Sequence, residues 1–291
     1  LWRMEFAPQT IIYLSSRERI YDMIIIGEKI NGAIPSIKQA IAEKNEGLII
    51  ERTLAQAKAG ANFLDCAPST ATEIEYETMV WLIGLMQGCT DVPLCIDSPN
   101  AKLLARIIEE GHLKRPGMVN SVNEEGDKCE TIFPLIAGTP WEVVGLTCDQ
   151  EGIPADPKKK VEIAKRIIDK ADKFGVALKQ LHIDPCVMAL ATMPTAMEDF
   201  AYCIEHIHAY APEVKVTGAI SNISFEMPAR KYVNMNCMAY AIAAGLDSAI
   251  MDPCSADMMG TIYACEALRM TDKGGRKYNR AYRKGIFGQK K

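Results

Sequence analysis

Short apolar stretches that end in an acid or an amide recur eight times along the chain, separated by segments with helical periodicity. The stretches read MIIIGEKIN, ANFLDCA, PLCIDSPN, GMVNSVN, EVVGLTCD, LHIDP, VTGAISN and SAIMDPC. Continuous apolar runs that alternate with helical patterns are typical of parallel strands joined by crossover helices. Eight such units, with polar residues only at the strand ends, predict a single (β/α)8 TIM barrel.

The pattern also predicts where each element lies. Strands are predicted at residues 23–26, 62–64, 93–96, 117–119, 141–146, 180–183, 215–219 and 247–251. Helices are predicted at residues 47–59, 73–87, 100–110, 127–137, 157–174, 195–209, 231–244 and 256–269. Gly60, Gly175 and Gly245 each follow a helical stretch, as helix-ending glycines do. Pro157 lies near a helix start, where its missing N–H costs nothing.

The barrel pattern covers residues 23–271 and leaves a segment at each end. Residues 1–22 mix charges into an apolar stretch and lack the apolar region of a signal peptide. We expect either an extension from an expression vector or upstream translation, with Met23 as the natural start, or a genuine segment packed on the barrel bottom. Residues 272–291 form a basic C-terminal tail with eight lysines and arginines against one aspartate. They are interpreted as a solvated tail or as a docking site for an acidic partner.

Composition narrows the possible functions. Hydrophobic residues make up 48% of the chain, enough for a large core, and the net charge of −4 argues against nucleic-acid binding. No apolar run approaches the roughly 20 residues that span a bilayer, so we expect no membrane association. The ten cysteines are scattered without a C-x-x-C pair, which indicates free thiols in a reducing cytoplasm.

The active site of a (β/α)8 barrel lies at its C-terminal mouth. The side chains expected there are acids and amides: Glu28, Asn31, Asp65, Asp97, Asn120, Asn123, Asp149, Asp184, Asn222 and Asp252. Carboxylates accept two parallel hydrogen bonds from a guanidine-like edge, and amides donate and accept at once. Such a set suits a flat heterocycle such as a pterin. Any one of these residues is equally well interpreted as a turn residue that ends a strand.

Other catalytic patterns are missing from the sequence, including the phosphate-binding glycine loops and the serine-hydrolase and zinc-protease motifs. His206 and His208 are two positions apart on a predicted helix and point in different directions. His182 lies inside a predicted strand, so we expect a core histidine. No Cys and His cluster suggests a zinc site, and a metal-free reaction is favoured. A magnesium site among the aspartates stays open, because oxygen ligands leave no spacing signature.

Several motifs resemble those of the pterin-binding methyltransferases, and most closely the methyltetrahydrofolate:corrinoid methyltransferases. The motifs are IGEKING, LCIDSPN, MVNSVNEE, HIDPCV, AISNISFEMPAR and AYAIAAGLDSAIMDPCSADMM. The resemblance covers roughly residues 23–270 in order. It is shared in looser form with the folate module of cobalamin-dependent methionine synthase and with dihydropteroate synthase.

The resemblance implies a role for four residues at the mouth. Asp97, Asn120 and Asp184 would hold the pyrimidine edge of the pterin. Asn222 would be the catalytic residue, forming a hydrogen bond near N5, the atom that carries the methyl group.

Two more residues are implied in the loop after the seventh predicted strand. Ser221 would join Asn222 in binding folate, and Arg230 would meet its p-aminobenzoyl-glutamate part. The chain departs from the family pattern at LDCAPS, where L-D-x-N-x-G is common, and this puts a direct role for Asp65 in doubt. Ala219 stands where the family pattern has glycine.

The activity implied by the resemblance is methyl transfer between a corrinoid and N5 of tetrahydrofolate, without a covalent enzyme intermediate. The corrinoid would arrive on a separate protein, because the pattern shows no second domain. A homodimer is also implied, with anaerobic one-carbon metabolism or O-demethylation as the setting. The basic segment 272–291 would then attract an acidic corrinoid protein or polyglutamate tails.

Two alternatives stay open. One is a dihydropteroate synthase-like enzyme, which needs a pyrophosphate site; Lys29 and Arg230 are candidates, but the strand-1 signature of that enzyme is absent. The other is a folate-binding module without catalysis. The direction of transfer and the upstream methyl donor are not specified by the sequence.

Overall fold

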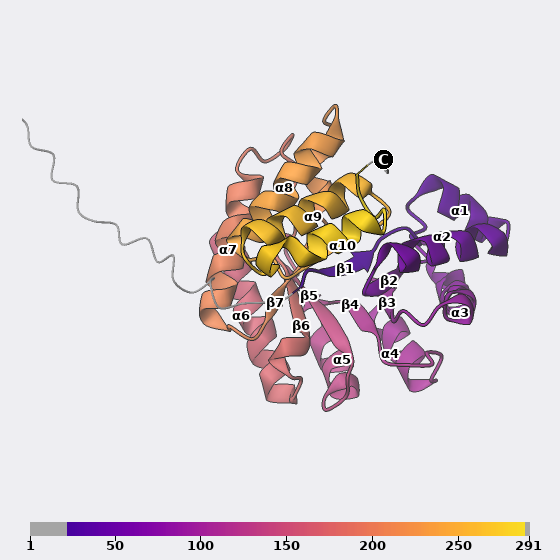
Figure 1. The fold of residues 1–291 in the computed structure, drawn as a ribbon. Coiled ribbons are helices and arrows are strands. Elements are labelled where there is room, and N and C mark those ends of the chain that lie inside the picture. The colour runs from indigo at the N-terminus through magenta and orange to yellow at the C-terminus, as the bar shows by residue number, and fades with distance from the viewer. Residues whose placement is uncertain (1–21, 289–291) are drawn as a thin grey trace, which may run out of the picture.

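The computed structural model describes residues 22–288 and shows eight parallel strands in one sheet, with helices around it (Figure 1). The strands are β1 (Ile24–Gly27), β2 (Phe63–Cys66), β3 (Leu94–Asp97), β4 (Met118–Glu124), β5 (Glu142–Asp149), β6 (Leu181–Asp184), β7 (Lys215–Val216) and β8 (Ser248–Met251). Their order is β7-β6-β5-β4-β3-β2-β1-β8.

Backbone hydrogen bonds close this sheet into a barrel between its two outermost strands. The N–H of Asp247 donates to the carbonyl of Val216 (3.1 Å), and the N–H of Ile250 donates to that of Gly218 (3.0 Å). Closure removes the exposed strand edges on which further pairing would occur. The predicted (β/α)8 barrel is confirmed.

The helices lie on the outside of the barrel (Figure 1). They are α1 (Pro35–Ala42), α2 (Glu46–Ala59), α3 (Thr72–Cys89), α4 (Ala101–Glu109), α5 (Lys128–Ile136), α6 (Pro157–Phe174), α7 (Ala196–Tyr210), α8 (Arg230–Ala244), α9 (Ala256–Leu268) and α10 (Arg276–Arg283). Gly60, Gly175 and Gly245 end α2, α6 and α8 with positive φ of 97°, 79° and 116°. Pro157 is the first residue of α6, so all four of these punctuation predictions are confirmed.

Two layers of apolar side chains hold the barrel together. A small cluster of Ile26, Cys95, Met118 and Val144, all fully buried, comes from strands β1, β3, β4 and β5. A much larger cluster fills the space between the sheet and the helices. Each fully buried aliphatic side chain contributes roughly 1.5–3 kcal/mol. With its interior filled in this way, the barrel has room for polar chemistry only at its ends.

The sequence pattern misplaces part of strand β7. A strand is predicted at residues 215–219, but β7 ends at Val216, and a 3-10 helix, η2, follows at Ile220–Ser224. The pattern also does not predict α1, whose eight residues are too few for a clear helical period. Pro35 begins this helix, and Ile37, Ala40 and Ile41 are its buried face.

As far as Gly288, the C-terminal segment packs against the barrel and does not extend into solvent. A short 3-10 helix, η3 (Lys273–Gly275), leads into α10, which lies beside α9 (Figure 1). Ala281 and Phe287 are only 3% and 7% exposed. Neither element is predicted from the sequence, because the basic composition hides the few apolar anchors. Residues 289–291 and all of residues 1–22 except Asp22 lie outside the described part of the chain.

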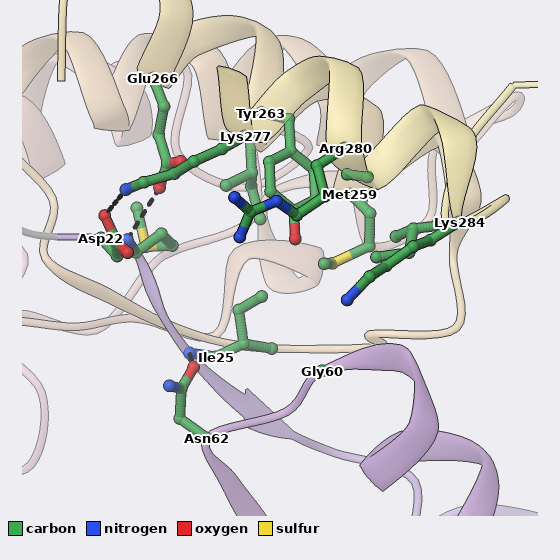
Figure 2. Close-up of a pocket in the computed structure, with 14 residues that line it drawn as sticks. Asp22, Ile25, Gly60, Asn62, Met259, Tyr263, Glu266, Lys277, Arg280 and Lys284 are labelled. Atoms are coloured by element: carbon green, nitrogen blue, oxygen red, sulfur yellow. Dashed lines mark hydrogen bonds and ion pairs between the residues drawn. The ribbon is translucent and has the colours of Figure 1, made fainter. Parts of the chain in front are cut away.

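Helix α10 borders a pocket of about 260 Å³ (Figure 2). Lys277, Arg280 and Lys284 line one side, and Ile25 of β1 and Asn62, just before β2, line the other. Because these barrel residues belong to the N-terminal ends of their strands, the basic helix lies at the end of the barrel opposite the mouth. A partner seated at the mouth would therefore not touch α10 directly.

The cysteines and the helix lengths bear on two further expectations. All ten cysteines are among the described residues and all are free thiols, as predicted. Within residues 22–288, no helix combines the length and apolarity required to cross a membrane.

We predict that Phe287→Ala lowers the free energy of unfolding by roughly 3 kcal/mol, the usual cost of deleting a buried aromatic ring. The ring of Phe287 stacks on Tyr263 at 5.7 Å and lies 4.8 Å from Tyr278. Urea unfolding followed by circular dichroism measures the loss. Tyr240→Ala, at a side chain that is 55% exposed, is the control and should change stability by less than about 0.5 kcal/mol. A loss below about 1 kcal/mol at Phe287 would mean that the segment is not anchored as described.

Candidate active site

Three residues implied in pterin binding lie at the mouth. Asp97 ends β3, Asn120 lies within β4, and Asp184 ends β6. Asp97 and Asn120 are register partners on adjacent strands, and the N–H of Ser98 donates to the carbonyl of Asn120 at 2.9 Å. The side chains of Asp97 and Asn120 are half-buried and form no hydrogen bond to any residue in the range 22–288. They are therefore available to a ligand.

A group of carboxyls lies on the adjoining strands β1 to β3. Burial raises the pKa of Asp97 to about 7, with a further contribution from Glu75. Burial, together with the charge of Asp97, also raises the pKa of Asp65 well above its ordinary value. Asp65 is 1% exposed, and one of its carboxylate oxygens has no hydrogen-bond partner within the described chain. These carboxyls hold protons near neutral pH because so little water reaches them.

Glu28, directly after β1, adds another acid to the mouth. Burial raises its pKa to about 7, against the lowering effect of Lys29. Asp252, after β8, raises it further, and Arg230 lowers it. The ammonium of Lys29 is paired with the carboxylate of Asp252 at 3.0 Å. Lys29 is thus already paired with an acid other than Glu28.

Asp184 lies apart from these carboxyls, at the end of β6, and occupies a different environment. It is 6% exposed, and its Oδ1 accepts a hydrogen bond from the N–H of Cys186 at 2.8 Å. Burial raises the pKa of Asp184 to about 6, and the hydrogen bond from Cys186 limits the rise. Asp184 is therefore mostly ionised at pH 7, whereas Asp97 is close to half-ionised.

The loop after β7 carries Ser221 and Asn222 in η2. Both side chains are half-buried, and the Asn222 side-chain amide makes no hydrogen bond to any described residue. Arg230 fixes this loop: its Nη2 donates to the Ser221 carbonyl (2.7 Å) and its Nε donates to Ser224 Oγ (2.9 Å). Its guanidinium lies 4.9 Å from the ring centre of Phe225. Holding η2 in place is a role for Arg230 that its motif position alone does not indicate.

Glu75 is a site residue that the sequence pattern does not single out. It lies on α3, is 7% exposed, and accepts a hydrogen bond from Ser98 Oγ at 2.6 Å. Through this contact it approaches Asp97 and raises the pKa of that carboxyl. In the sequence, Glu75 is marked only by its position four residues before Met79, which places both on one face of a helix. This signal of burial is weak, because acids near helix starts are common.

All four histidines form hydrogen bonds within the protein. His182 is fully buried and forms hydrogen bonds with Ser248 Oγ (2.7 Å) and Glu142 (2.5 Å), so the expectation of a core histidine is confirmed. His206 contacts the carbonyl of Tyr202, whereas His208 contacts Asp247. Over residues 22–288, no three His, Cys, Asp or Glu side chains are grouped so as to hold a metal ion.

The chain is similar in sequence to one known protein family and to several known enzymes. The family model described as pterin binding enzyme matches residues 36–252. The chain is 46% identical over 268 residues to a methylcorrinoid:tetrahydrofolate methyltransferase of Eubacterium limosum, covering 91% of this chain and 98% of the relative. It is 31% identical over 242 residues to methionine synthase of Mycobacterium tuberculosis, covering 79% of this chain and 20% of that much longer protein.

Among solved structures, the fold is similar to that of dihydropteroate synthase from Thermus thermophilus, with a TM-score of 0.64 and 18% sequence identity. The match covers 87% of this chain and 98% of the synthase. At this identity the likeness shows a shared barrel fold and nothing about the reaction.

We predict that Asp65→Asn stabilises the protein at pH 8 and leaves its stability nearly unchanged at pH 4. The folded-state pKa of Asp65 is raised, so ionisation destabilises the fold increasingly as pH rises above the unfolded value of about 3.9. The neutral amide removes that cost. Denaturant unfolding at the two pH values measures the difference. Glu205→Gln, on the exposed side of α7, is the control and should show no gain. Equal effects at both pH values would refute the assigned ionisation.

Proposed function

The chain belongs to the pterin-binding enzyme family and to its methylcorrinoid:tetrahydrofolate methyltransferases, and we propose on this basis that its barrel mouth transfers a methyl group between a corrinoid and N5 of tetrahydrofolate. One observation carries the assignment of the site. Asp97, Asn120 and Asn222 present polar side chains, in half-buried positions at one end of the barrel, that form no hydrogen bond to other side chains or backbone of residues 22–288. Half-buried polar groups without a protein partner are free to form hydrogen bonds with a bound ligand in place of water.

The pyrimidine ring of a pterin matches the carboxyl and amide groups of the mouth. Its amino group and adjacent ring N–H form a guanidine-like edge, which donates two parallel hydrogen bonds to a carboxylate. We propose Asp184 as the main acceptor, because its pKa of about 6 lies below the pKa of about 7 of Asp97, so that it is the more ionised of the two at pH 7. Asn120 would accept and donate at the remaining edge, and Asp97 would complete the contact.

Methyl transfer requires control of the charge on N5. The corrinoid, brought as a substrate on a partner protein, supplies a methyl group whose carbon–cobalt bond breaks with both electrons left on the metal. N5 provides the lone pair for the new bond. In the reverse direction, N5 leaves the methyl group only when protonated or strongly hydrogen-bonded. The amide oxygen of Asn222 can accept the N–H of N5 both when neutral N5 attacks with its lone pair and when the protonated, methylated N5 leaves, so it serves both directions.

The transfer is proposed to be direct, with no methylated enzyme. Most of the rate would then come from holding N5 and the methyl carbon in line, since binding replaces a bimolecular encounter with a positioned one. Arg230 supports this positioning by fixing the η2 loop that carries Asn222. Ser221 would line the folate beside it.

The dihydropteroate synthase-like alternative finds no specific support at the mouth. That reaction needs free cations for pyrophosphate, and Lys29 is paired with Asp252 while Arg230 is bonded to η2. A folate-binding module without catalysis would bind tetrahydrofolate but show no turnover, which the kinetic experiment on Asn222 also measures.

We also propose a cytoplasmic enzyme of one-carbon or O-demethylation metabolism, without a bound metal, that forms a homodimer. The mouth must stay open to a corrinoid, which is large, so the dimer contact would use the outer helices.

We predict that Asp184→Ala weakens tetrahydrofolate binding by about 2–3 kcal/mol, the usual loss when one partner of a charged hydrogen bond is removed. Isothermal titration calorimetry at pH 7 gives the dissociation constants. Glu109→Ala, an exposed carboxylate on α4, is the matched control and should bind as the wild type does. Unchanged affinity in Asp184→Ala would remove this residue from the pterin site.

We predict that Asn222→Ala lowers kcat by roughly 10²-fold and changes tetrahydrofolate affinity much less, because its hydrogen bond to N5 is strongest in the transition state. The loss of methylcobalamin absorbance measures the rate. Asn236→Ala, on the exposed side of α8, is the control. Wild-type turnover in Asn222→Ala would leave this residue as part of a turn, and bound folate without turnover in the wild type would favour the non-catalytic module.

A further inference from the structure

Lys160 is buried in the first turn of α6, where its charge is unfavourable by general rules. It is 2% exposed, the lowest value among the lysines of residues 22–288, while its neighbour Lys158 is exposed. Burying an ammonium costs several kcal/mol unless it is paired, and a cation near a helix N-terminus opposes the helix dipole. A lysine in this position therefore needs a compensating partner.

Its partner is the turn that follows Asp184. The Nζ of Lys160 donates to the carbonyl of Cys186 at 2.9 Å, while the N–H of Cys186 donates to Asp184 Oδ1 at 2.8 Å. Cys186 has φ of 58°, in the left-handed region that costs a non-glycine residue roughly 1–2 kcal/mol. The two hydrogen bonds hold Cys186 in this conformation. Its N–H contacts the carboxyl group of Asp184, and its carbonyl contacts the ammonium group of Lys160.

We propose that Lys160 is a positioning residue for folate binding, which fixes the Asp184–Cys186 turn and places a positive charge at that turn. This inference rests on the proposed function only for the identity of the ligand. The hydrogen bonds that join Lys160 to Asp184 through Cys186 do not depend on the ligand.

The charges around the turn support this link. Burial raises the pKa of Asp184, and the N–H of Cys186 and the positive charge of Lys160 oppose the rise. Burial also raises the pKa of the nearby thiols, to about 12 for Cys203, so they are neutral at pH 7. The other titratable groups around Asp184 and Lys160 are Cys148 on β5, Cys186 and Cys203, with Asp156 and Asp199 beside Cys203. In the described part of the chain, Lys160 is thus the cation whose charge lowers the pKa of Asp184.

Removal of Lys160 would affect Asp184 in two ways. The carboxylate would lose a nearby positive charge, which raises its pKa further, and Cys186 would lose the hydrogen bond that orients its N–H. Since only an ionised carboxylate accepts both N–H groups of a guanidine-like edge, folate affinity near neutral pH would fall. The loss would be recovered at higher pH, where Asp184 ionises without help.

The test measures the ionisation of Asp184 directly and folate binding separately. Protein labelled with 13C at the aspartate carboxyls is titrated by NMR, and the Asp184 signal is identified by its absence in Asp184→Asn. Three variants separate the two effects of the lysine. Lys160→Met removes both charge and donor, Lys160→Gln keeps a donor without the charge, and Lys160→Arg keeps both. Lys158→Met, two residues earlier and exposed, is the matched control.

The Asp184 midpoint should lie near 6 in the wild type and in Lys158→Met. It should rise by roughly one to two pH units in Lys160→Met and Lys160→Gln, and Lys160→Arg should restore it. Tetrahydrofolate should bind Lys160→Met about two- to tenfold more weakly at pH 7, with the difference nearly gone at about pH 8.5.

An unchanged Asp184 midpoint in folded Lys160→Met would overturn the proposal. If that variant does not fold, the midpoint in Lys160→Gln decides in the same way. A wild-type protein that binds no tetrahydrofolate would defeat the proposed function, whereas the NMR titration would still decide whether Lys160 controls Asp184.

Discussion

The proposed chemistry of the barrel mouth depends on one constraint, the burial of carboxyl groups at the strand ends. A closed parallel barrel with a filled interior has room for polar groups only at its ends. Closure between β7 and β8 pairs the outermost strands, and apolar side chains fill the interior. Acids that end the strands therefore stand at the boundary between a dry core and the solvent. Burial raises the pKa of Glu28 and Asp97 to about 7 and that of Asp184 to about 6.

The burial of these carboxyl groups favours the binding of a ligand and lowers the stability of the fold. Ionised carboxylates packed together repel one another, and each has given up water that only a hydrogen-bond donor can replace. The two cations that act on Glu28 are already engaged, since Lys29 pairs with Asp252 and Arg230 fixes η2. A flat donor-rich ring relieves this arrangement, whereas a pyrophosphate would worsen it. The electrostatics thus favour the binding of an uncharged pterin ring over the binding of a pyrophosphate group.

The ends of most strands could be predicted from sequence because their signal is local. An apolar run followed by an acid or an amide marks a strand end, as at Asp97 and Asp184, and helix-ending glycines mark the units between. Elements that depend on distant contacts could not be predicted in this way. Helix α10 is held by a few anchors such as Phe287 within a basic segment, and β7 stops at Val216 where η2 begins.

Residues that act through other residues were also beyond the sequence pattern. Glu75 reaches Asp97 from α3, and Lys160 reaches Asp184 through the backbone of Cys186. In a linear sequence, both look like ordinary charged residues on amphipathic helices. Only the packing of the helix against the strand end shows that each side chain points inward.

The proton balance of pterin binding tests the central claim most directly. Calorimetric titration with tetrahydrofolate at about pH 6.5, in two buffers of different ionisation enthalpy, gives the number of protons exchanged. If carboxyls with pKa values of about 6 to 7 must ionise to hold the pterin, binding releases protons to the buffer. Tight binding with no proton release would contradict the account, because the pterin would then be held by groups other than the buried acids of the mouth.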